Sequence, residues 1–205
     1  MSGGLIGALA SRARAARDRV LDHARLNDPA LRVLNLGCGV DLMPTADNVD
    51  VVETAPGVTV VDLNAFPWNL PSTHYDYVIA INVMEHLADP VRVVEEIHRV
   101  LKPGGTAVMR TPYWNSPDQF ADLTHRQAFS HRSFDMFDPT TTLGRQRSYY
   151  TTTRFSVDRY FVFIRPFGVY IPIGGPRPLV AGILRLAERF GRIVWSQEHW
   201  LTKRP

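Results

Sequence analysis

The sequence has a single cysteine, Cys38, among its 205 residues. One cysteine excludes a disulfide within the chain and is typical of a reducing compartment, so we expect a cytoplasmic protein. No apolar run approaches the ~18 residues that a membrane span requires. Leu5–Ala10 is too short for a signal peptide and no charged region precedes it, so we expect no membrane partner.

The sequence also has little net charge, formally +3. Residues 1–32 contain six arginines and three aspartates, so the rest of the chain is balanced. This argues against a broad nucleic-acid-binding face, and we expect no nucleic-acid partner. The arm over residues 1–28 is rich in alanine, arginine and leucine, which predicts a helix from about Leu5 to Leu26.

A glycine turn follows the first apolar strand. Val33, Leu34 and Leu36 have the character of a short buried strand, and Gly37-Cys38-Gly39 ends it. Two glycines let a ligand lie against bare backbone, with N–H groups free to donate. A second apolar strand leads to Asp50, which is suited to accept hydrogen bonds from ribose hydroxyls. Strand, turn, strand and acid together predict a nucleoside pocket.

The third glycine of the dinucleotide fingerprint is missing, because Leu42 stands there. This disfavours an NAD-dependent oxidoreductase. Only 10 residues separate Gly39 from Asp50, too few for a full crossover helix. The first two helical connections are therefore expected to shrink to about a turn each.

Alternating strands and helices continue after Asp50, which indicates an α/β fold with a parallel sheet. A third strand over 58–61 ends at Asp62, which could contact a ligand or cap a turn. A fourth strand is expected over Asp76–Asn82. Asp89-Pro90 begins a helix that ends at the Lys102–Gly105 turn, before a fifth strand over Thr106–Arg110.

These landmarks, in this order, resemble class I S-adenosylmethionine-dependent methyltransferases of the small-molecule, type 11-like kind. The resemblance covers about residues 30–112 and rests on the following stretches: Leu34–Gly39, Asp50, Asp62, Asp76–Asn82, Glu85–Leu87 and Leu101–Gly105. It implies a Rossmann-like domain over 1–205, with a mostly parallel seven-stranded sheet, shortened early helices and an antiparallel final strand. It also implies S-adenosylmethionine as cofactor. Val40-Asp41 departs from the usual small residues after the glycine turn.

The resemblance assigns roles to residues around the pocket. Asp50 would hold the ribose, Asp62 and Leu63 would flank the adenine, and Asn82 would face the methionine end of the cofactor. The complete implied cofactor-binding set is Gly37, Cys38, Gly39, Asp50, Val51, Asp62, Leu63, Asn82 and Val83.

Residues 113–150 break the alternation directly after the fifth strand, where irregular segments tend to form a substrate wall. We predict Tyr113, Trp114 and Asp122 as substrate-contacting residues. The aromatic side chains of this segment suit a flat or ring-bearing small molecule. They could equally fill a second small core.

Two histidines are candidates for catalysis. His125 or His86 could take a proton from an attacking hydroxyl or amine, since an imidazole with a pKa of ~6.5 suits that task. Glu85-His86 and Thr124-His125 also resemble a pattern in ubiquinone-type O-methyltransferases and small-RNA 2′-O-methyltransferases, where two glutamates and two histidines bind a divalent cation. Asn82 replaces the first glutamate, which weakens a hard-cation site, and we expect no metal. The remaining interpretation is that Glu85 and His86 only orient the loop after the fourth strand.

The C-terminal third is expected to hold a sixth strand over 154–165, bent near Asp158. A loop with four prolines follows over Pro166–Pro178, then a helix over Leu179–Phe190 and a last strand over Ile193–Arg204.

The predicted function is S-adenosylmethionine-dependent methyl transfer to a small-molecule acceptor, through oxygen, with nitrogen as the alternative. A metal-assisted O-methyltransferase using Glu85, His86 and His125 is a second hypothesis. A non-catalytic S-adenosylmethionine-binding partner subunit is a third. The sequence leaves a homodimer open.

Overall fold

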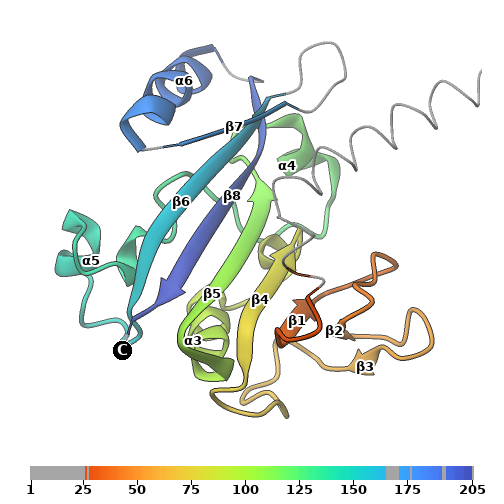
Figure 1. Cartoon of the computed structure of the whole chain (residues 1–205). Coiled ribbons are helices and arrows are strands. Elements are labelled where there is room, and N and C mark those ends of the chain that lie inside the picture. Colours follow the sequence, from red (N-terminus) through yellow and green to blue (C-terminus); the bar gives the residue numbers. More distant parts are fainter. Residues whose placement is uncertain (1–25, 27, 165–170, 176, 191–192, 205) are drawn as a thin grey trace, which may run out of the picture.

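The computed structural model describes Leu26 and residues 28–164, 171–175, 177–190 and 193–204. One sheet holds eight strands in the order β3-β2-β1-β4-β5-β8-β6-β7 (Figure 1). The strands are β1 (Val33–Leu36), β2 (Ala46–Asp50), β3 (Thr59–Val60), β4 (Tyr75–Ile81), β5 (Leu101–Pro112), β6 (Phe155–Ile164), β7 (Ile171–Gly175) and β8 (Val194–Lys203). The helices are η1 (Met84–His86), α3 (Pro90–Val100), α4 (Pro117–Ala121), η2 (Asp135–Phe137), α5 (Thr142–Gln146) and α6 (Arg177–Phe190).

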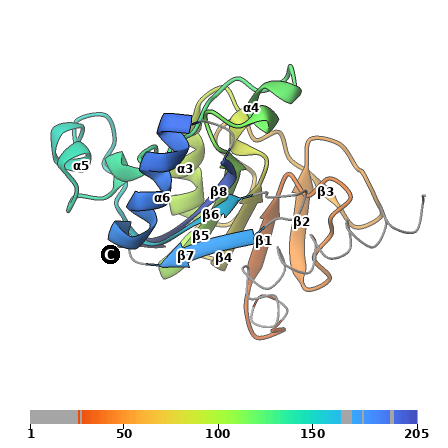
Figure 2. The same cartoon turned by 90° about the horizontal axis from the view of Figure 1, so that it is seen from above.

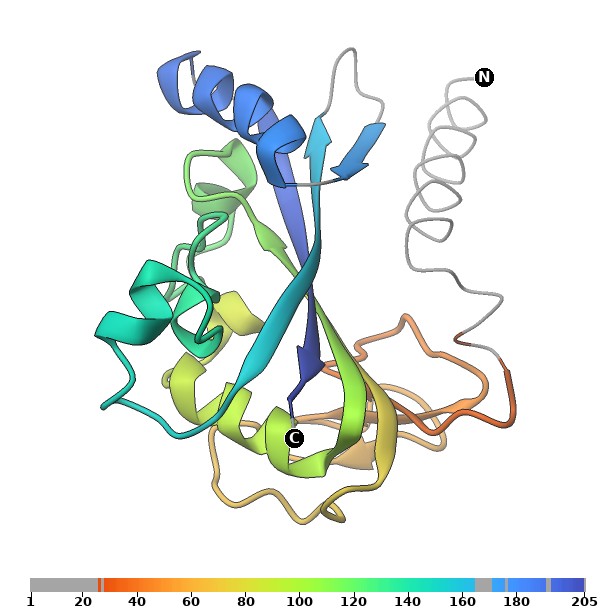
Figure 3. The ribbon, with the colours of Figure 1, turned by 60° about the vertical axis from the view of Figure 1, so that its left-hand side comes forward.

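The first five strands pair in parallel, and β8 lies antiparallel between β5 and β6. This is the mostly parallel sheet with an antiparallel final strand that the sequence predicts. The register of β6 against β8 shifts between Val157 and Arg159, so the predicted bend near Asp158 is present. The sheet is strongly twisted (Figure 3). The helix predicted over Leu5–Leu26 lies outside the described residues, apart from Leu26 itself.

The predicted strand count of seven is wrong. Ile171–Gly175, which we expected inside a proline-rich loop, pairs antiparallel with β6 from Ile164↔Ile171 to Tyr160↔Gly175. This strand lies at the edge of the sheet, where a proline is tolerated because the outer side has no ladder to complete. The rest of the predicted loop lies largely outside the described residues.

The connection from β1 to β2 contains no helix, and hydrogen bonds of side-chain amides stabilise it. Asn35, in β1, donates from Nδ2 to Asn48 Oδ1 in β2 at 2.9 Å. The same Asn48 oxygen accepts the Met43 N–H at 3.0 Å, and Asn48 Nδ2 donates to the Met43 carbonyl at 2.9 Å. These bonds satisfy backbone polar groups of a tight turn. The chain has no helix between β1 and β2, so the predicted shortening of the first helix is confirmed.

Helix α3 begins as predicted, with Asp89 accepting the Arg92 N–H at 3.1 Å and Pro90 at the first helical position. Val93, Val94 and Ile97 are fully buried and belong to the main core cluster, which includes Val78 and Ala80 of β4. α3 and α6 cover the same face of the sheet (Figure 2). No helix in the described part of the chain is long and apolar enough to cross a membrane.

Candidate functional site

A cavity of about 290 Å³ lies at the carboxyl ends of β1, β2 and β4. Ligands of open α/β sheets bind at this edge, because the loops that leave parallel strands meet there. The cavity is lined by Gly37, Asp50, Val51, Val61, Asp62, Leu63, Asn64, Asn82, Val83, His86 and Leu87. Seven of the nine predicted cofactor-binding residues are in this set.

The glycine turn forms one wall of the cavity. Gly37 has a φ of +57°, and a Cβ at this position would collide with the Cγ2 atom of Val83. Only glycine therefore fits, on grounds of both backbone conformation and space. The turn leaves a concave surface of bare backbone that a side chain would fill.

Cys38 and Gly39 are predicted cofactor-binding residues that do not line this cavity. The Cys38 N–H donates to the Val49 carbonyl at 3.0 Å, and burial raises the pKa of its thiol. The Gly39 N–H donates to Asp50 Oδ2 at 2.8 Å. Both residues thus stabilise the turn through hydrogen bonds to β2.

Asp50 organises the same turn. Its Oδ2 accepts from Gly39, and its Oδ1 accepts the N–H of Val51 at 2.7 Å. An ionised carboxylate has about four lone-pair directions, so one on each oxygen stays available after these two bonds. Asp50 can therefore hold the turn and still accept hydrogen bonds from two ligand hydroxyls.

The opposite wall comes from the loop after β3. Asp62 accepts the Asn64 N–H at Oδ1, at 2.9 Å, which closes a tight turn. Asn64 in turn accepts the Ala88 N–H at 2.9 Å, tying this loop to the segment after η1. Asn64 lines the cavity without having been predicted, although it directly follows the predicted Asp62-Leu63 pair. Val61 and Leu87 are further lining residues that were not predicted.

Asn82 follows β4 in the left-handed region, with a φ of +54°. Asparagine tolerates this conformation better than most residues. Its N–H donates to the Arg110 carbonyl at 2.9 Å, so β5 fixes the turn. The turn directs the chain into η1, which carries His86 to the wall of the cavity.

His86 and His125 lie side by side, with ring centroids 4.7 Å apart. The Thr124 hydroxyl donates to Asp122 Oδ1 at 2.7 Å, so it is left to accept from His86 Nδ1, which lies 2.9 Å away. This places the proton of neutral His86 on Nδ1 and the lone pair on Nε2. Hydrogen bonds from the Thr124 hydroxyl and N–H lower the pKa of Asp122, which keeps it anionic.

His125 is oriented in the same way. Its Nδ1 lies 2.9 Å from the carbonyl oxygen of Gln119, and a carbonyl can only accept. Neutral His125 therefore also carries its proton on Nδ1 and its lone pair on Nε2. The site presents two imidazoles whose tautomers are set by their neighbours.

Glu85 is fully buried beside these histidines. Neither of its carboxylate oxygens has a hydrogen-bond partner among the described residues, and burial raises its pKa to about 7. One ligand atom from each of Glu85, His86 and His125 lies within 4.8 Å of the other two. One carboxylate and two imidazoles could hold a divalent metal ion, and within the described part of the chain this is the group that meets that criterion.

The predicted substrate residues are placed differently from one another. Tyr113 is fully buried and packs in a cluster with Tyr160. Trp114 is 41% exposed, and Asp122 is exposed with its Oδ1 accepting from the Thr124 hydroxyl and N–H. None of the three lines the cavity. The interpretation as a second small core therefore holds for Tyr113, and substrate contact stays a prediction for Trp114 and Asp122.

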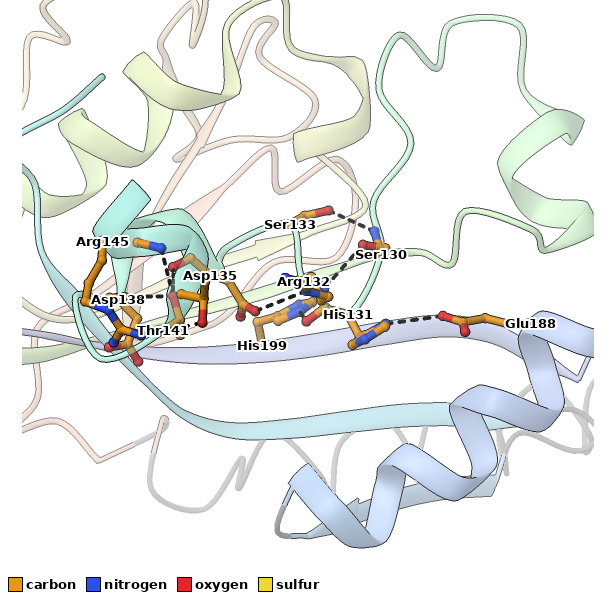
Figure 4. A network of polar contacts seen from close by, with 12 residues as sticks. Ser130, His131, Arg132, Ser133, Asp135, Asp138, Thr141, Arg145, Glu188 and His199 are labelled. Atoms are coloured by element: carbon orange, nitrogen blue, oxygen red, sulfur yellow. Dashed lines mark hydrogen bonds and ion pairs between the residues drawn. The ribbon is translucent and has the colours of Figure 1, made fainter. Parts of the chain in front are cut away.

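The second half of the 113–150 segment is fixed by its own polar network (Figure 4). The Ser130 N–H donates to Ser133 Oγ at 2.8 Å, and the Thr141 hydroxyl donates to the Asp135 carbonyl at 2.7 Å. His131 Nδ1 lies 3.7 Å from a Glu188 carboxylate oxygen on α6. The contact between His131 and Glu188 joins the segment to α6. None of the residues in these contacts lines the cavity.

A family model described as a methyltransferase domain matches residues 8–146. The chain is 29% identical over 128 residues to an uncharacterised 37.1 kDa protein of transposon Tn4556 from Streptomyces fradiae, covering 60% of this chain and 35% of that protein. It is 28% identical over 131 residues to 2-methyl-6-phytyl-1,4-hydroquinone methyltransferase 2, chloroplastic, from Oryza sativa subsp. japonica, covering 52% and 37%. The chain thus spans little more than a third of the length of these curated relatives.

Solved structures share the fold. A SAM-dependent methyltransferase from Archaeoglobus fulgidus superposes with a TM-score of 0.57 at 21% identity, over 90% of this chain and 94% of that one. Another from Thermotoga maritima gives a TM-score of 0.60 at 15% identity, over 96% and 92%. The predicted Rossmann-like fold of class I methyltransferases is therefore confirmed.

Proposed function

Since the chain belongs to the methyltransferase domain family, whose methyl donor is S-adenosylmethionine, we propose that it transfers a methyl group from this cofactor to a small-molecule acceptor. One observation carries the proposal. Gly37, Asp50, Asp62 and Asn82 converge on one cavity, and His86 forms part of its wall. This lining supports a nucleoside pocket with a proton acceptor beside it.

The residues present fit the cofactor. Asp50 would accept hydrogen bonds from the two ribose hydroxyls through the lone pairs that the turn leaves free. Asp62 and Leu63 would flank the adenine, and the bare backbone at Gly37 would lie against the methionine part, with Asn82 and Val83 beside it. When bound, S-adenosylmethionine supplies an electrophilic methyl group on a sulfonium sulfur.

The protein's own contribution to the reaction would be alignment and proton removal. His86, with its lone pair on Nε2, would accept the proton of an acceptor hydroxyl as that oxygen gains the methyl group. The adjacent His125 has the same tautomer and could hold the acceptor or share the role. We propose oxygen as the nucleophile, with an amine nitrogen as the alternative.

Calorimetric titration with S-adenosylmethionine and its demethylated product tests the proposal. We expect both to bind, and we expect Asp50→Ala to weaken binding by more than about a hundredfold, because two hydrogen bonds to a charged group, worth ~1.5–3 kcal/mol each, are lost. Glu53→Gln, an exposed carboxylate away from the cavity lining, serves as the matched control and should bind normally. Failure of the wild-type protein to bind either compound would refute the cofactor assignment. Binding without transfer to any acceptor would favour the partner-subunit hypothesis.

A metal-assisted O-methyltransferase is the second candidate function, and the buried Glu85 favours it. A carboxylate without hydrogen bonds is costly to bury, and a cation would satisfy it. The replacement of the first glutamate by Asn82 weakens a site for ions such as magnesium, which prefer oxygen ligands. The observed set has two imidazoles, which suit zinc, cobalt or nickel. In this alternative, His86 and His125 bind the ion through Nε2.

Cobalt(II) titration distinguishes the two candidates without relying on turnover. If the metal-assisted alternative holds, cobalt(II) should develop visible absorption bands on binding, and Glu85→Gln should weaken its binding at least about tenfold, by loss of the one anionic ligand. Glu53→Gln is again the control and should match the wild-type protein. If cobalt(II) does not bind and chelator leaves methyl transfer unchanged, the metal-assisted alternative is rejected. The proposal that His86 accepts the proton without a metal then remains.

A further inference from the structure

Asp122 is the acidic residue that the Thr124 side chain contacts, and its Oδ1 atom accepts two hydrogen bonds from Thr124. We propose that Asp122 is a positioning residue, which acts through the Thr124 hydroxyl to keep the lone pair of His86 on Nε2. This role is separate from the substrate contact that the sequence predicts for Asp122. The inference rests on the proposed function, since a lone pair on Nε2 is what the proposed proton acceptor needs.

The Thr124 hydroxyl has a single proton and lies between two partners. One is Asp122 Oδ1, at 2.7 Å, and the other is His86 Nδ1, at 2.9 Å. A carboxylate can only accept a hydrogen bond, whereas an imidazole nitrogen donates or accepts according to the tautomer. Asp122 therefore sets the direction. While it accepts the hydroxyl proton, the hydroxyl has only lone pairs to offer to His86.

The Asp122 carboxylate is held in place by the same neighbour. Its Oδ1 atom accepts the Thr124 N–H at 2.8 Å in addition to the hydroxyl, so both donors of Thr124 converge on one oxygen. These hydrogen bonds lower the pKa of Asp122, so the carboxylate stays anionic and continues to accept. The hydroxyl proton of Thr124 therefore has a fixed acceptor.

Removal of the Asp122 carboxylate would reverse the hydrogen bond to His86. The Thr124 hydroxyl would be free to donate to His86 Nδ1, and the imidazole proton would then reside on Nε2. His86 would present a donor in place of an acceptor at the wall of the cavity. The hydroxyl of a methyl acceptor would meet a nitrogen that cannot take its proton.

His125 provides an internal reference for this effect. Its Nδ1 lies 2.9 Å from the Gln119 carbonyl, which can only accept whatever residue stands at position 122. The His125 N–H donates to the backbone carbonyl of Asp122 at 3.3 Å, and side-chain variants retain that carbonyl. A change of tautomer confined to His86 thus reports the contact through Thr124. A change in both histidines would report a displaced segment.

Nitrogen-15 NMR of the imidazole rings tests the inference, because the two ring nitrogens are distinct and their shifts report which one is protonated. Spectra are recorded at about pH 9, above the ordinary imidazole pKa of ~6.5, with chelator present so that no metal ion fixes the tautomer. In the wild-type protein we expect His86 and His125 both to be protonated on Nδ1. In Asp122→Ala we expect His86 to change mainly to the Nε2–H form, while His125 stays unchanged.

Turnover should follow the tautomer of His86. Asp122→Ala should lower kcat about tenfold, at the lower end of the range for loss of an outer-shell partner, because Asp122 and Thr124 are exposed to solvent. KM and the affinity for the cofactor should change little. Asp122→Asn keeps an acceptor oxygen in the same position, so it should restore the Nδ1–H form and most of kcat.

Asp158→Ala is the matched control, since Asp158 is an exposed aspartate of β6 outside the cavity lining. It should give the wild-type spectrum and turnover. The inference is overturned if His86 of the wild-type protein is protonated on Nε2, or if it keeps the Nδ1–H form in Asp122→Ala. It is also overturned if both histidines change together, or if asparagine at position 122 is no better than alanine.

The spectra separate this inference from the proposed function, because they require neither cofactor nor acceptor. An unchanged His86 tautomer in Asp122→Ala, together with normal cofactor binding, rejects the role of Asp122 alone. Failure of the wild-type protein to bind the cofactor rejects the proposed function itself and leaves the tautomer result in place.

Discussion

Gly37→Ala is expected to weaken the binding of S-adenosylmethionine by about tenfold to a hundredfold, because relieving the ~1–3 kcal/mol of overpacking at the added Cβ distorts the pocket. The new methyl group would collide with Val83 Cγ2. Val83 lines the cavity, so the side chain can yield only by changing the shape of the pocket. Calorimetry with the demethylated cofactor measures the loss.

Gly39→Ala is the matched control for this prediction. Gly39 has nearly the same φ, +52°, but a Cβ there would meet no atom within 4 Å. The substitution should lower the free energy of unfolding by ~1–2 kcal/mol through backbone strain, yet leave most of the cofactor affinity. Equal affinity losses in the two variants would mean that the contact with Val83 does not matter.

Thr124→Val is expected to lower kcat about a hundredfold while KM changes little, because loss of an outer-shell partner typically costs 10–100-fold and a wrong tautomer costs more. Valine has nearly the shape of threonine but cannot accept a hydrogen bond from the Nδ1–H group of His86. His86 then no longer keeps its lone pair on Nε2, where the site requires it. Steady-state kinetics on the same acceptor measure the effect.

Thr124→Ser restores the hydroxyl and should recover most of kcat. Rescue by serine distinguishes a role in orienting His86 from a role in packing, since serine lacks the methyl group that valine retains. If the valine variant keeps wild-type turnover, or if serine is no better than valine, the hydrogen bond from His86 to Thr124 has no part in catalysis.

The cavity at the carboxyl ends of the strands could be predicted because its elements are local in sequence. The glycine turn follows β1 directly, and Asp50 ends the neighbouring strand β2. Parallel pairing of adjacent strands brings these two ends together without further information. The Asp62-Leu63 pair follows from the same rule applied to β3.

The arrangement around the histidines could be predicted only in part. The sequence indicates His86 and His125 as candidates, but the Thr124 contact with His86 joins residues 38 positions apart. That contact depends on the path of the 113–129 segment, which the Glu85 carbonyl fixes by accepting the N–H groups of Arg126 and Gln127. No sequence spacing encodes such a path. The same holds for Asp122, whose hydrogen bonds to Thr124 no sequence spacing encodes and whose contact with substrate stays a prediction.

Burial accounts for the remaining differences. Tyr113 and Trp114 are adjacent aromatics with the same composition signal, yet one is fully buried and the other is exposed, because Tyr113 directly follows β5 and Trp114 lies in the turn after it. Strand β7 was missed because proline normally excludes a strand, and its position at the sheet edge removes that objection.

The hydrogen bond that Asp50 accepts from the Gly39 N–H also bears on how fast the cofactor binds. A turn that the protein's own hydrogen bonds hold in place loses little further freedom when a ligand binds. A preorganised site of this kind keeps the association rate constant near the ordinary range of ~10⁵–10⁷ M⁻¹s⁻¹ and places differences between cofactor analogues in their residence times. A cofactor and its spent product would then exchange at rates set by how quickly each one leaves.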